Sequence, residues 1–378
     1  MKIVYCLNSL YIKGGLERVI TERANYLSEI FGYEIIFVTT DQEEKELAYE
    51  KRENIRLIDL DCNYYKNYKK NYFFRQILNL KKYFKHIKEL QNIINKEKPD
   101  YVVSLGYEEN IIFPFLKRRN CKFIREFHNP DLNDILYKNK KKLIFQRIKN
   151  FLNNSLLKDF DIYIFLTEED KQRRKNLQNK KSYVINNFIT VEAQKIAKLQ
   201  NKKALSVGRL EYQKGYDILI DVWKKVSEAY PEWKLEIYGT GKDRKKLSEK
   251  IERLNLTKNI FLKGQTNRIE EKYIESSIYI LSSRYEGMPL VLIEAQSFGI
   301  PVVAFDSPCG PKEIIQNGEN GFLCKFDDIR EMSNKIIYLI ENEEKRVKMG
   351  KLAKESTYKY QKDYIMNKWK KMLEKEKI

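Results

Sequence analysis

The 378-residue sequence predicts an α/β protein with two domains, each built on a parallel β-sheet. Three observations favour this fold class. Short apolar runs bounded by turn or charged residues alternate with helical patterns, which is typical of parallel α/β architecture. The alternation stops in a polar stretch near the middle of the chain and then starts again. The length, with 42% hydrophobic residues, suffices for two domains of ordinary size.

The apolar runs define the expected strands. In the first half we expect strands at residues 3–7, 34–39, 101–105, 123–127 and 162–166. In the second half we expect them at 204–208, 235–238, 260–262, 278–281 and 302–305. The polar stretch 190–202 is the predicted linker. We therefore expect two Rossmann-like domains, at 1–190 and 203–357, that face each other across a cleft.

Composition limits the possible partners and compartment. The chain has 72 Lys and Arg against 53 Asp and Glu, and residues 61–160 alone hold 22 basic against 10 acidic residues. This excess indicates an anionic partner, whether nucleic acid, a phosphorylated substrate or a membrane surface. No stretch approaches the roughly 20 apolar residues of a membrane span, so we expect a soluble, cytoplasmic protein. The five scattered cysteines indicate neither a disulfide framework nor a zinc site.

The most informative stretch is residues 283–295. It follows an apolar strand, and Pro289 stands where the first residue of a helix is expected, a position that suits proline. The helix is expected to continue to Phe298, before Gly299. Glu286 lies in the loop, and the side chain of Glu294 tilts back toward the helix N-terminus, so both carboxylates can border one cleft.

The same loop suits a phosphate group. Gly287 permits close approach of the backbone, and the free N–H groups at the helix start favour an anion. A phosphate flanked by groups that bind hydroxyls indicates a nucleotide sugar. The alternative is structural: Glu286 is then a loop charge and Glu294 a solvated helix residue.

Other strand ends contain polar groups, and ligands of open α/β sheets bind there. Gly14 and Gly15 open a helix after the first strand, which suits a phosphate but also a plain tight turn. His128 follows a strand and lies on a loop. The other histidine, His86, sits among lysines on a helix and is expected to be exposed. Arg209 and Lys214 flank the loop after strand 204–208, where two cations suit a diphosphate.

Three weaker motifs are set aside. The stretch 239–244 imitates a dinucleotide fingerprint but has arginine in place of the third glycine and lacks a Walker ending, which disfavours NAD enzymes and kinases. Two D-x-D triplets, 59–61 and 159–161, are too short and too far from the site to indicate a metal, so no metal cofactor is expected. The lysine tract at 138–142 has no accompanying nucleic-acid motif, so no nucleic-acid partner is expected.

Together these features resemble glycosyltransferase family 4. The resemblance rests on Glu286 and Glu294 with seven residues between them, the Gly14-Gly15 loop, Arg209 with Lys214, His128, and the loops 309–313 and 317–321. It spans nearly the whole chain. It implies a GT-B fold and transfer of a sugar from a nucleotide sugar with retention of anomeric configuration.

The resemblance also implies roles for the residues. Arg209 and Lys214 neutralise the diphosphate, Glu294 binds the ribose, and Glu286 binds hydroxyls of the donor sugar. The backbone of Gly287, Met288, Pro289 and Leu290 helps to hold sugar and phosphate. Gly264 and Gln265 lie in the loop that reads the base, for which UDP is the commonest choice. His128 meets the sugar from the acceptor-binding first domain, onto which the C-terminal helix, 358–378, packs back.

Two hypotheses of function remain at this stage. The first is a retaining hexosyltransferase that moves a hexose or N-acetylhexosamine to a lipid-linked or polysaccharide acceptor, in capsule or lipopolysaccharide synthesis. The second is a basic membrane- or nucleic-acid-binding protein on a degenerate GT-B fold. Intact charged groups at several strand ends favour the enzyme.

A final pattern concerns the basic first half. Phe73, Ile77, Leu80, Phe84 and Ile87 recur at helical spacing and form one apolar stripe, with lysines largely off it. Tyrosines alternate with lysines at 64–72, and residues 138–158 add seven cations without an acid. We expect the first domain to dock on the anionic inner face of the cell membrane. The alternative is a helix whose apolar stripe packs on its own domain.

Overall fold

The structure is a computed structural model that describes residues 1–106, 108–118, 120–130, 157–191 and 193–377. The chain forms two compact units, Met1–Ile185 with Met366–Ile378, and Asn186–Ile365. The chain therefore leaves the first unit after Ile185 and returns to it within its last helix. Each unit has its own sheet and its own core.

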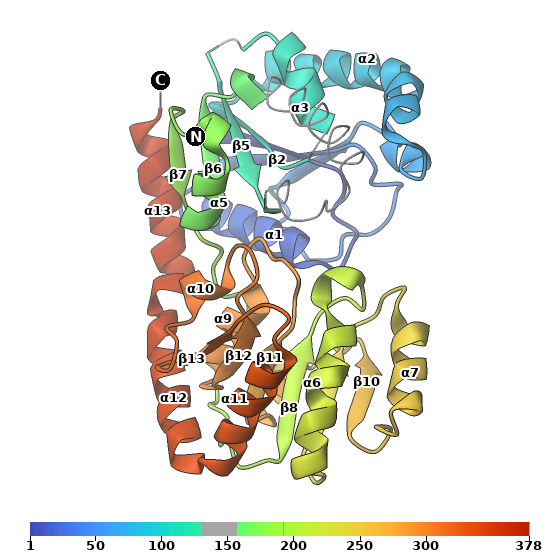
Figure 1. Cartoon of the computed structure of the whole chain (residues 1–378). Coiled ribbons are helices and arrows are strands. Elements are labelled where there is room, and N and C mark those ends of the chain that lie inside the picture. Colours follow the sequence, from blue (N-terminus) through green and yellow to red (C-terminus); the bar gives the residue numbers. More distant parts are fainter. Residues whose placement is uncertain (107, 119, 131–156, 192, 378) are drawn as a thin grey trace. The chain divides into compact units, whose positions relative to one another are not determined.

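The described part of the first unit contains a seven-stranded parallel sheet with the order β3-β2-β1-β4-β5-β6-β7 (Figure 1). Its strands are β1 (Lys2–Leu7), β2 (Glu34–Thr39), β3 (Arg56–Asp59), β4 (Tyr101–Ser104), β5 (Lys122–Phe127), β6 (Ile162–Phe165) and β7 (Ser182–Val184). In the register, Ile3 of β1 pairs with Ile35 on one side and with Tyr101 on the other. The central strands are buried because helices cover both faces of such a sheet.

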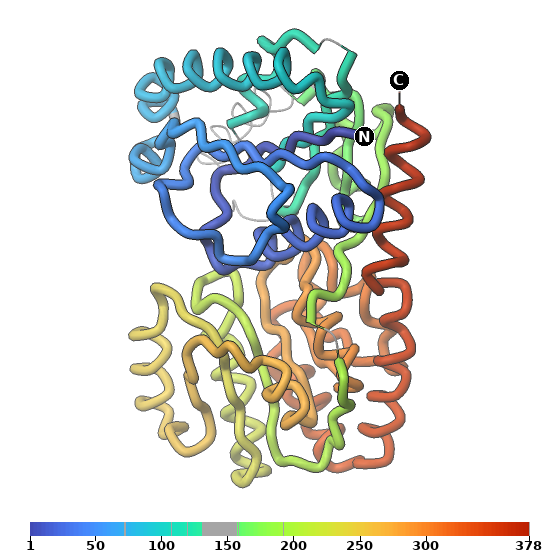
Figure 2. The backbone as a smooth tube through the Cα atoms, turned by 180° about the vertical axis from the view of Figure 1, so that it is seen from behind, coloured from blue at the N-terminus to red at the C-terminus, as the bar shows by residue number. Residues whose placement is uncertain are grey.

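The helices of this unit follow the strands in the alternating order that the sequence predicts. They are α1 (Gly15–Glu29), α2 (Tyr72–Glu97), α3 (Glu108–Ile112), α5 (Glu168–Arg173) and most of α13 (Lys362–Lys375). Figures 1 and 2 both show α13 beside β7. Tyr183 of β7 donates a hydrogen bond to Glu376 (2.5 Å), and Tyr101 donates one to the carbonyl of Leu373 (2.5 Å). None of the described helices is long and apolar enough to cross a membrane.

The second unit contains a parallel sheet with the order β10-β9-β8-β11-β12-β13. Its strands are β8 (Lys203–Val207), β9 (Lys234–Tyr238), β10 (Ile260–Gly264), β11 (Ile278–Leu281), β12 (Val302–Phe305) and β13 (Gly321–Cys324). Its helices are α6 (Tyr216–Ala229), α7 (Arg244–Arg253), α8 (Ile269–Ile274), α9 (Leu290–Ser297), α10 (Pro311–Ile314), α11 (Ile329–Glu341) and α12 (Glu343–Ser356). The strand order reverses between β8 and β11, which is the topological switch point where such sheets bind ligands.

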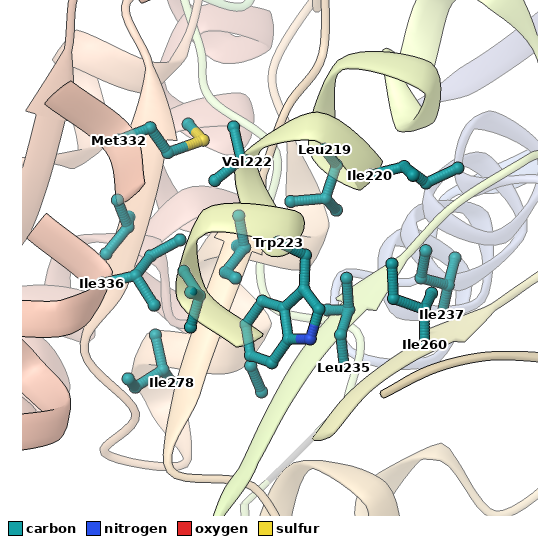
Figure 3. Close-up of a cluster of buried hydrophobic side chains, with 14 of the residues drawn as sticks. Leu219, Ile220, Val222, Trp223, Leu235, Ile237, Ile260, Ile278, Met332 and Ile336 are labelled. Carbon is teal, nitrogen blue, oxygen red and sulfur yellow. The ribbon is translucent and has the colours of Figure 1, made fainter. Parts of the chain in front are cut away.

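The core of the second unit fixes α6 onto its sheet. Trp223 of α6 is fully buried and lies among apolar side chains of the strands and of α11 (Figure 3). Leu219, Val222 and Val226 recur at helical spacing beside it and are also buried. Full burial of one large apolar side chain contributes about 1.5–3 kcal/mol. This packing holds the start of α6, and therefore the loop before it, at the end of β8.

The stretch 190–202 contains no described helix or strand, but it lies within the second unit. Ala197 donates a backbone hydrogen bond to Phe298 (2.9 Å), and Ile189 donates one to Tyr360 (2.9 Å). The unit boundary at Ile185 therefore precedes the predicted linker by a few residues.

Candidate functional site

Two loops of the second unit meet at its switch point. The first, residues 208–215, joins β8 to α6, and the second, residues 282–289, joins β11 to α9. Because β8 and β11 are neighbouring parallel strands, their carboxyl ends lie side by side, and both loops begin there. Five of the predicted donor-binding residues lie on these loops: Arg209, Lys214, Gly287, Met288 and Pro289.

Hydrogen bonds join the two loops. Ser282 donates to the carbonyl of Lys214 (2.9 Å), and the backbone N–H of Arg284 donates to the carbonyl of Gln213 (2.7 Å). The guanidinium of Arg284 also makes a bidentate pair with Asp217 in the first turn of α6 (2.8 and 2.7 Å). A bidentate pair fixes orientation as well as distance. The loops and the start of α6 therefore act as one structural group.

At the centre of this group, Lys214 pairs with Glu286. Its Nζ lies 2.7 Å from Oε1 of Glu286, and the hydroxyl of Ser283 donates to the same oxygen (2.5 Å). Glu286 is only 5% exposed. A buried carboxylate requires such partners because desolvation penalises its charge. The sequence predicted Lys214 and Glu286 but not Ser283, whose type is common in loops.

Glycines permit the close approach of these loops. Gly215 has a φ of +65°, and a Cβ there would overlap the carbonyl oxygen of Ser282. A Cβ at Gly208 would lie 2.9 Å from the hydroxyl of Tyr216 and 3.1 Å from Cε of Lys214. Burial raises the pKa of Tyr216, so this phenol stays protonated at neutral pH. Both positions therefore require glycine for packing.

Glu294 projects from α9 into a buried hydrogen-bonded site. Its Oε1 accepts from the hydroxyl of Thr190 (2.9 Å) and its Oε2 from the hydroxyl of Tyr273 (2.9 Å). Glu294 is 7% exposed. Glu294 is therefore not the solvated helix residue of the structural alternative, and Glu286 is a loop carboxylate that is buried and bonded.

The segment between the two glutamates packs against the loop after β12. Met288 is buried, and its sulfur accepts from the backbone N–H of Asn187 (3.3 Å). The sequence predicted Pro289 as the first residue of the helix. In the structure Pro289 is the N-cap of α9, and Leu290 is the first helical residue. Gly310, with a φ of +103°, lies where a Cβ would contact Pro289. The backbone of residues 287–290 thus packs against residues 309–313.

The other predicted donor-binding residues of the second unit lie at the carboxyl ends of strands of the same sheet. Arg209 follows β8, is 65% exposed and lies 3.6 Å from Glu211. Gly264 ends β10, and its carbonyl accepts from the N–H of Gly239 (2.8 Å). Gln265 follows it and is exposed. A Cβ at Gly239 would overlap the carbonyl of Gly208, so the glycines of the false dinucleotide motif serve loop packing.

In the first unit, Gly14 and Gly15 lie at the start of α1. Gly14 is the N-cap with an extended backbone, so no left-handed turn requires glycine there. A Cβ at Gly14 would instead overlap the carboxylate of Glu17. The glycine therefore leaves room for an acidic side chain in the first turn of the helix.

His128 follows β5 and belongs to a buried charged network. Its Nε2 lies 2.8 Å from Glu126, which also makes a bidentate pair with Arg23 (2.7 and 2.7 Å). Arg23 stacks on Trp369 of α13, 4.1 Å from the ring centre. Burial alone would raise the pKa of Glu126, but Arg23 and His128 hold it at about 2. Glu126 is therefore ionised at neutral pH and orients the His128 ring.

His86 corrects a prediction. It is fully buried on α2, with Nδ1 3.2 Å from the hydroxyl of Tyr64, and is not exposed as expected. Burial lowers its pKa to about 3, so it is neutral at physiological pH. Its neighbours in sequence are lysines, but its neighbours in space belong to the core.

The D-x-D triplets have structural partners. Asp59 accepts from Thr39 (2.9 Å), while Asp161 accepts from Arg118 (2.5 Å) and from the backbone N–H of Phe123 (2.7 Å). Within the described ranges, no group of three or more His, Cys, Asp or Glu side chains is placed to hold a metal ion.

Comparison with known families covers most of the chain. Residues 188–356 match Glycosyl transferases group 1, and residues 13–193 match Glycosyltransferase Family 4. An uncharacterized glycosyltransferase of Haemophilus influenzae is 29% identical over 98% of this chain and 99% of its own length. The amylovoran biosynthesis glycosyltransferase AmsD of Erwinia amylovora is 35% identical, over 50% of this chain and 51% of AmsD.

Solved structures share the whole fold. TarM superimposes with a TM-score of 0.80 at 19% identity over 98% of both chains. Sucrose-phosphate synthase from Thermosynechococcus elongatus superimposes with a TM-score of 0.81 at 15% identity over 99% of this chain and 98% of its own. The two parallel-sheet domains thus have the GT-B fold. The chain belongs to glycosyltransferase family 4, whose C-terminal half is the group 1 domain.

Proposed function

We propose that this protein is a retaining glycosyltransferase that moves a hexose or N-acetylhexosamine from a UDP-sugar to a lipid-linked or polysaccharide acceptor of a surface glycan. The observation that carries the proposal is the bonded group of Lys214 with the buried residues Glu286 and Ser283 at the switch point of the second sheet. It combines a cation for phosphate with a carboxylate for hydroxyls in one place.

The names of related proteins support the choice of donor and pathway. Anabaena HepE was crystallised with UDP and glucose, and the pneumococcal O-GlcNAc transferase GtfA with UDP and GlcNAc. Relatives by sequence include a poly(ribitol-phosphate) alpha-N-acetylglucosaminyltransferase of Staphylococcus aureus, 32% identical over 50% of this chain and 38% of its own length. This name describes a polymeric acceptor, and the name of a structural neighbour, the lipopolysaccharide outer core galactosyltransferase WaaB, describes a lipopolysaccharide one. Both favour a polymeric or lipid-linked glycan acceptor.

The proposed chemistry assigns a role to each part of the site. As the bond between sugar and phosphate breaks, negative charge develops on the leaving diphosphate. Lys214, the exposed Arg209 and the backbone N–H groups at the start of α9 would stabilise this charge. These groups can supply the stabilisation that a metal ion would otherwise provide, so we propose that no metal is required.

The Lys214–Glu286 pair suggests how the donor engages. Without a donor, each member of the pair neutralises the other, and Ser283 holds the carboxylate in place. A diphosphate would compete for Lys214, so that Oε1 of Glu286 would keep the hydrogen bond from Ser283 and could also accept from a sugar hydroxyl. Binding of the two halves of the donor is thereby coupled.

Nucleotide and acceptor recognition complete the proposal. Glu294 would bind the ribose hydroxyls, and the Gly264–Gln265 segment would meet the base. The first unit would bind the acceptor, with Gly14 and Gly15 beside the donor phosphate and His128 at the reacting sugar. We place the enzyme in the cytoplasm, on the inner face of the cell membrane. A degenerate fold that only binds membranes or nucleic acid is disfavoured, because the charged groups at the switch point are intact and mutually bonded.

Thermal stability with a panel of nucleotides tests the proposal. We expect UDP to raise Tm, because a ligand at 100 times its Kd stabilises the folded state by about 2.7 kcal/mol. One UDP-hexose or UDP-N-acetylhexosamine should stabilise the protein further and be slowly hydrolysed. Lys214→Ala should remove most of the UDP effect, whereas Lys225→Ala, an exposed lysine of α6, should not. If no nucleotide or nucleotide sugar changed Tm, the proposal would be wrong.

A further inference from the structure

One helix of the first unit exposes an unusual amount of apolar surface. The outer face of α2 comprises the apolar residues Phe73, Phe74, Ile77, Leu78, Leu80 and Phe84. Each is between 40% and 70% exposed, and Ile77 (70%) and Phe84 (66%) are the most exposed. Figures 1 and 2 both show α2 at the margin of its unit. Contiguous apolar surface of this kind marks an interaction site.

The core contacts of α2 come from a different face. Tyr83, His86, Leu90 and Ile94 are buried at helical spacing and pack with the core of the first unit. Because each residue turns the helix by about 100°, this buried stripe lies about a third of a turn from Ile77, Leu80 and Phe84. Of the predicted apolar stripe, Ile87 packs against the core, whereas Ile77, Leu80 and Phe84 are 70%, 56% and 66% exposed. The alternative in which this stripe packs on its own domain is therefore wrong for these three residues.

The charge around the outer face has one sign. Residues 62–88 contain eight basic residues and no acidic one. The basic residues are Lys66, Lys69, Lys70, Arg75, Lys81, Lys82, Lys85 and Lys88. Lys66, Lys69, Lys70 and Lys81 are exposed. The lysine-rich tract 138–142, also expected at this surface, lies outside the described residues.

Charge and apolar character together select the partner. A helix with lysines beside large apolar side chains is typical of segments that lie in the interface of an anionic bilayer, where the apolar groups enter the headgroup region. A tyrosine and lysine segment directly precedes the helix, and such side chains suit the same interface. A second copy of this chain would bring its own eight basic residues to the contact, and the repulsion between the two like-charged surfaces opposes association.

We propose that the outer face of α2 and the lysines before it dock this protein on an anionic lipid surface. The docking itself depends only on these residues. The link to function rests on the proposed activity: an enzyme held there meets a lipid-linked acceptor without a membrane-spanning segment.

Vesicle sedimentation of the whole protein tests the docking. We expect binding to phosphatidylcholine vesicles that contain phosphatidylglycerol, little binding to phosphatidylcholine alone, and weakening by salt as screening increases. Changing Lys66, Lys69 and Lys70 to Gln should weaken binding about 100-fold, at about fivefold for each lysine. Ile77→Ser with Phe84→Ser should weaken it about tenfold or more, because both side chains are largely exposed and available for burial.

Matched variants separate the face from net charge and general hydrophobicity. Changing Lys225, Lys245 and Lys246 to Gln removes the same charge from exposed lysines of the second unit. Ile30→Ser with Val347→Ser removes exposed apolar groups elsewhere. Both controls should bind vesicles like the wild type. Equal loss in the controls, equal binding to neutral vesicles, or no binding at low salt would overturn the proposal.

Two further readouts complete the test. Light scattering after gel filtration should show that the Ile77 and Phe84 variant has the same oligomeric state as the wild type. A dimer that this variant dissociates would assign the face to a second copy and overturn the proposal. Stabilisation by UDP, measured without vesicles, should be unchanged in the face variants. Failure of UDP binding in the wild type would refute the proposed activity but not the docking.

Discussion

Lys214 and Glu286 form an ion pair, 2.7 Å between Nζ and Oε1, that joins two loops 72 residues apart in the chain. Glu286 is buried and Lys214 is partly buried, and Ser283 donates to the same carboxylate oxygen. The cation proposed for the donor phosphate is therefore already held by the carboxylate proposed for the donor sugar. Substitution of either residue should therefore affect the position of the other.

The first prediction separates the two roles. Lys214→Ala should weaken UDP affinity about 10- to 100-fold, because a hydrogen bond to a charged group contributes about 1.5–3 kcal/mol. Glu286→Ala should mainly lower kcat, by about 100-fold or more, if its contacts strengthen in the transition state. Calorimetry and initial rates would measure these effects. The double variant should show less than the summed loss, since the residues are coupled. Wild-type affinity and turnover in both single variants would refute the assignment.

A second prediction concerns the glycine that lets the loops approach. Gly215→Ala places a Cβ on the carbonyl oxygen of Ser282 and should push apart the loops that hold Glu286 and Lys214. We expect kcat/KM to fall at least about tenfold. Gly318→Ala is the matched control, because Gly318 also has positive φ (+86°) but has open space where its Cβ would lie. It should cost about 1–2 kcal/mol of stability and leave kcat/KM near the wild-type value. Equal loss of kcat/KM in Gly215→Ala and Gly318→Ala would show that close packing of the two loops at Gly215 is not needed for activity.

The fold was largely predictable because the central strands of a parallel sheet are buried on both faces and read as apolar runs. The strands that the sequence did not predict, β3, β7 and β13, all lie at sheet edges. β3 is largely exposed, and β7 is only partly buried. β13 has four residues and begins with a glycine, so no run marks it.

The site was predictable to a lesser degree. A local motif identified Glu286 and Glu294, but their partners come from distant parts of the chain. Thr190, which donates to Glu294 across 104 residues, lies in a stretch read as linker. Tertiary pairing of this kind leaves no local pattern. His86 is different, because its helical spacing from Tyr83 and Leu90 could have placed it in the core.

The third prediction concerns Glu294. Glu294→Gln should cost about 1–3 kcal/mol of stability, because an amide NH2 replaces one carboxylate oxygen and cannot accept from the buried hydroxyl of Thr190 or Tyr273. It should also weaken UDP affinity about tenfold if the carboxylate binds the ribose. Tyr273→Phe is the control, since it removes one partner and leaves the carboxylate. Thermal melts and calorimetry should show similar destabilisation in both but weaker UDP binding only in Glu294→Gln. Equal affinity losses would indicate a purely structural carboxylate.

Metal independence is the fourth prediction. Activity should survive EDTA, because Lys214, Arg209 and the N–H groups at the start of α9 can stabilise the leaving diphosphate. Transfer rates with and without chelator, followed by addition of Mn²⁺ or Mg²⁺, would measure this. Loss on chelation and recovery with metal would contradict it. In that case, removing Arg209 should have little effect, which is the opposite of our expectation.

The last prediction uses two buried carboxyl groups of the first unit whose pKa values move in opposite directions. Burial, together with the neighbouring carboxylate of Glu108, raises the pKa of Glu109 to about 7. Its Oε2 has no hydrogen-bond partner among the described residues. The pKa of Glu126, by contrast, is held at about 2 by Arg23 and His128 against the effect of burial. Both groups have an ordinary value of 4.5 when unfolded.

The sign of each contribution follows from proton binding. Between pH 4.5 and about 7 folded Glu109 holds a proton that the unfolded chain has lost, so stability falls as pH rises, by up to about 3 kcal/mol. Glu126 contributes stability above pH 4.5 that is lost as pH falls toward 2. Glu109→Gln should therefore raise Tm at pH 8 and change it little at pH 4.5.

Glu126→Gln should lower Tm at pH 7, because Arg23 keeps a buried charge without its partner, at a cost of about 3–5 kcal/mol. Glu53→Gln, an exposed carboxyl of the same unit, should follow the wild-type curve throughout. A Glu109→Gln curve parallel to that of the wild type between pH 4.5 and 8 would show that Glu109 does not titrate in this range.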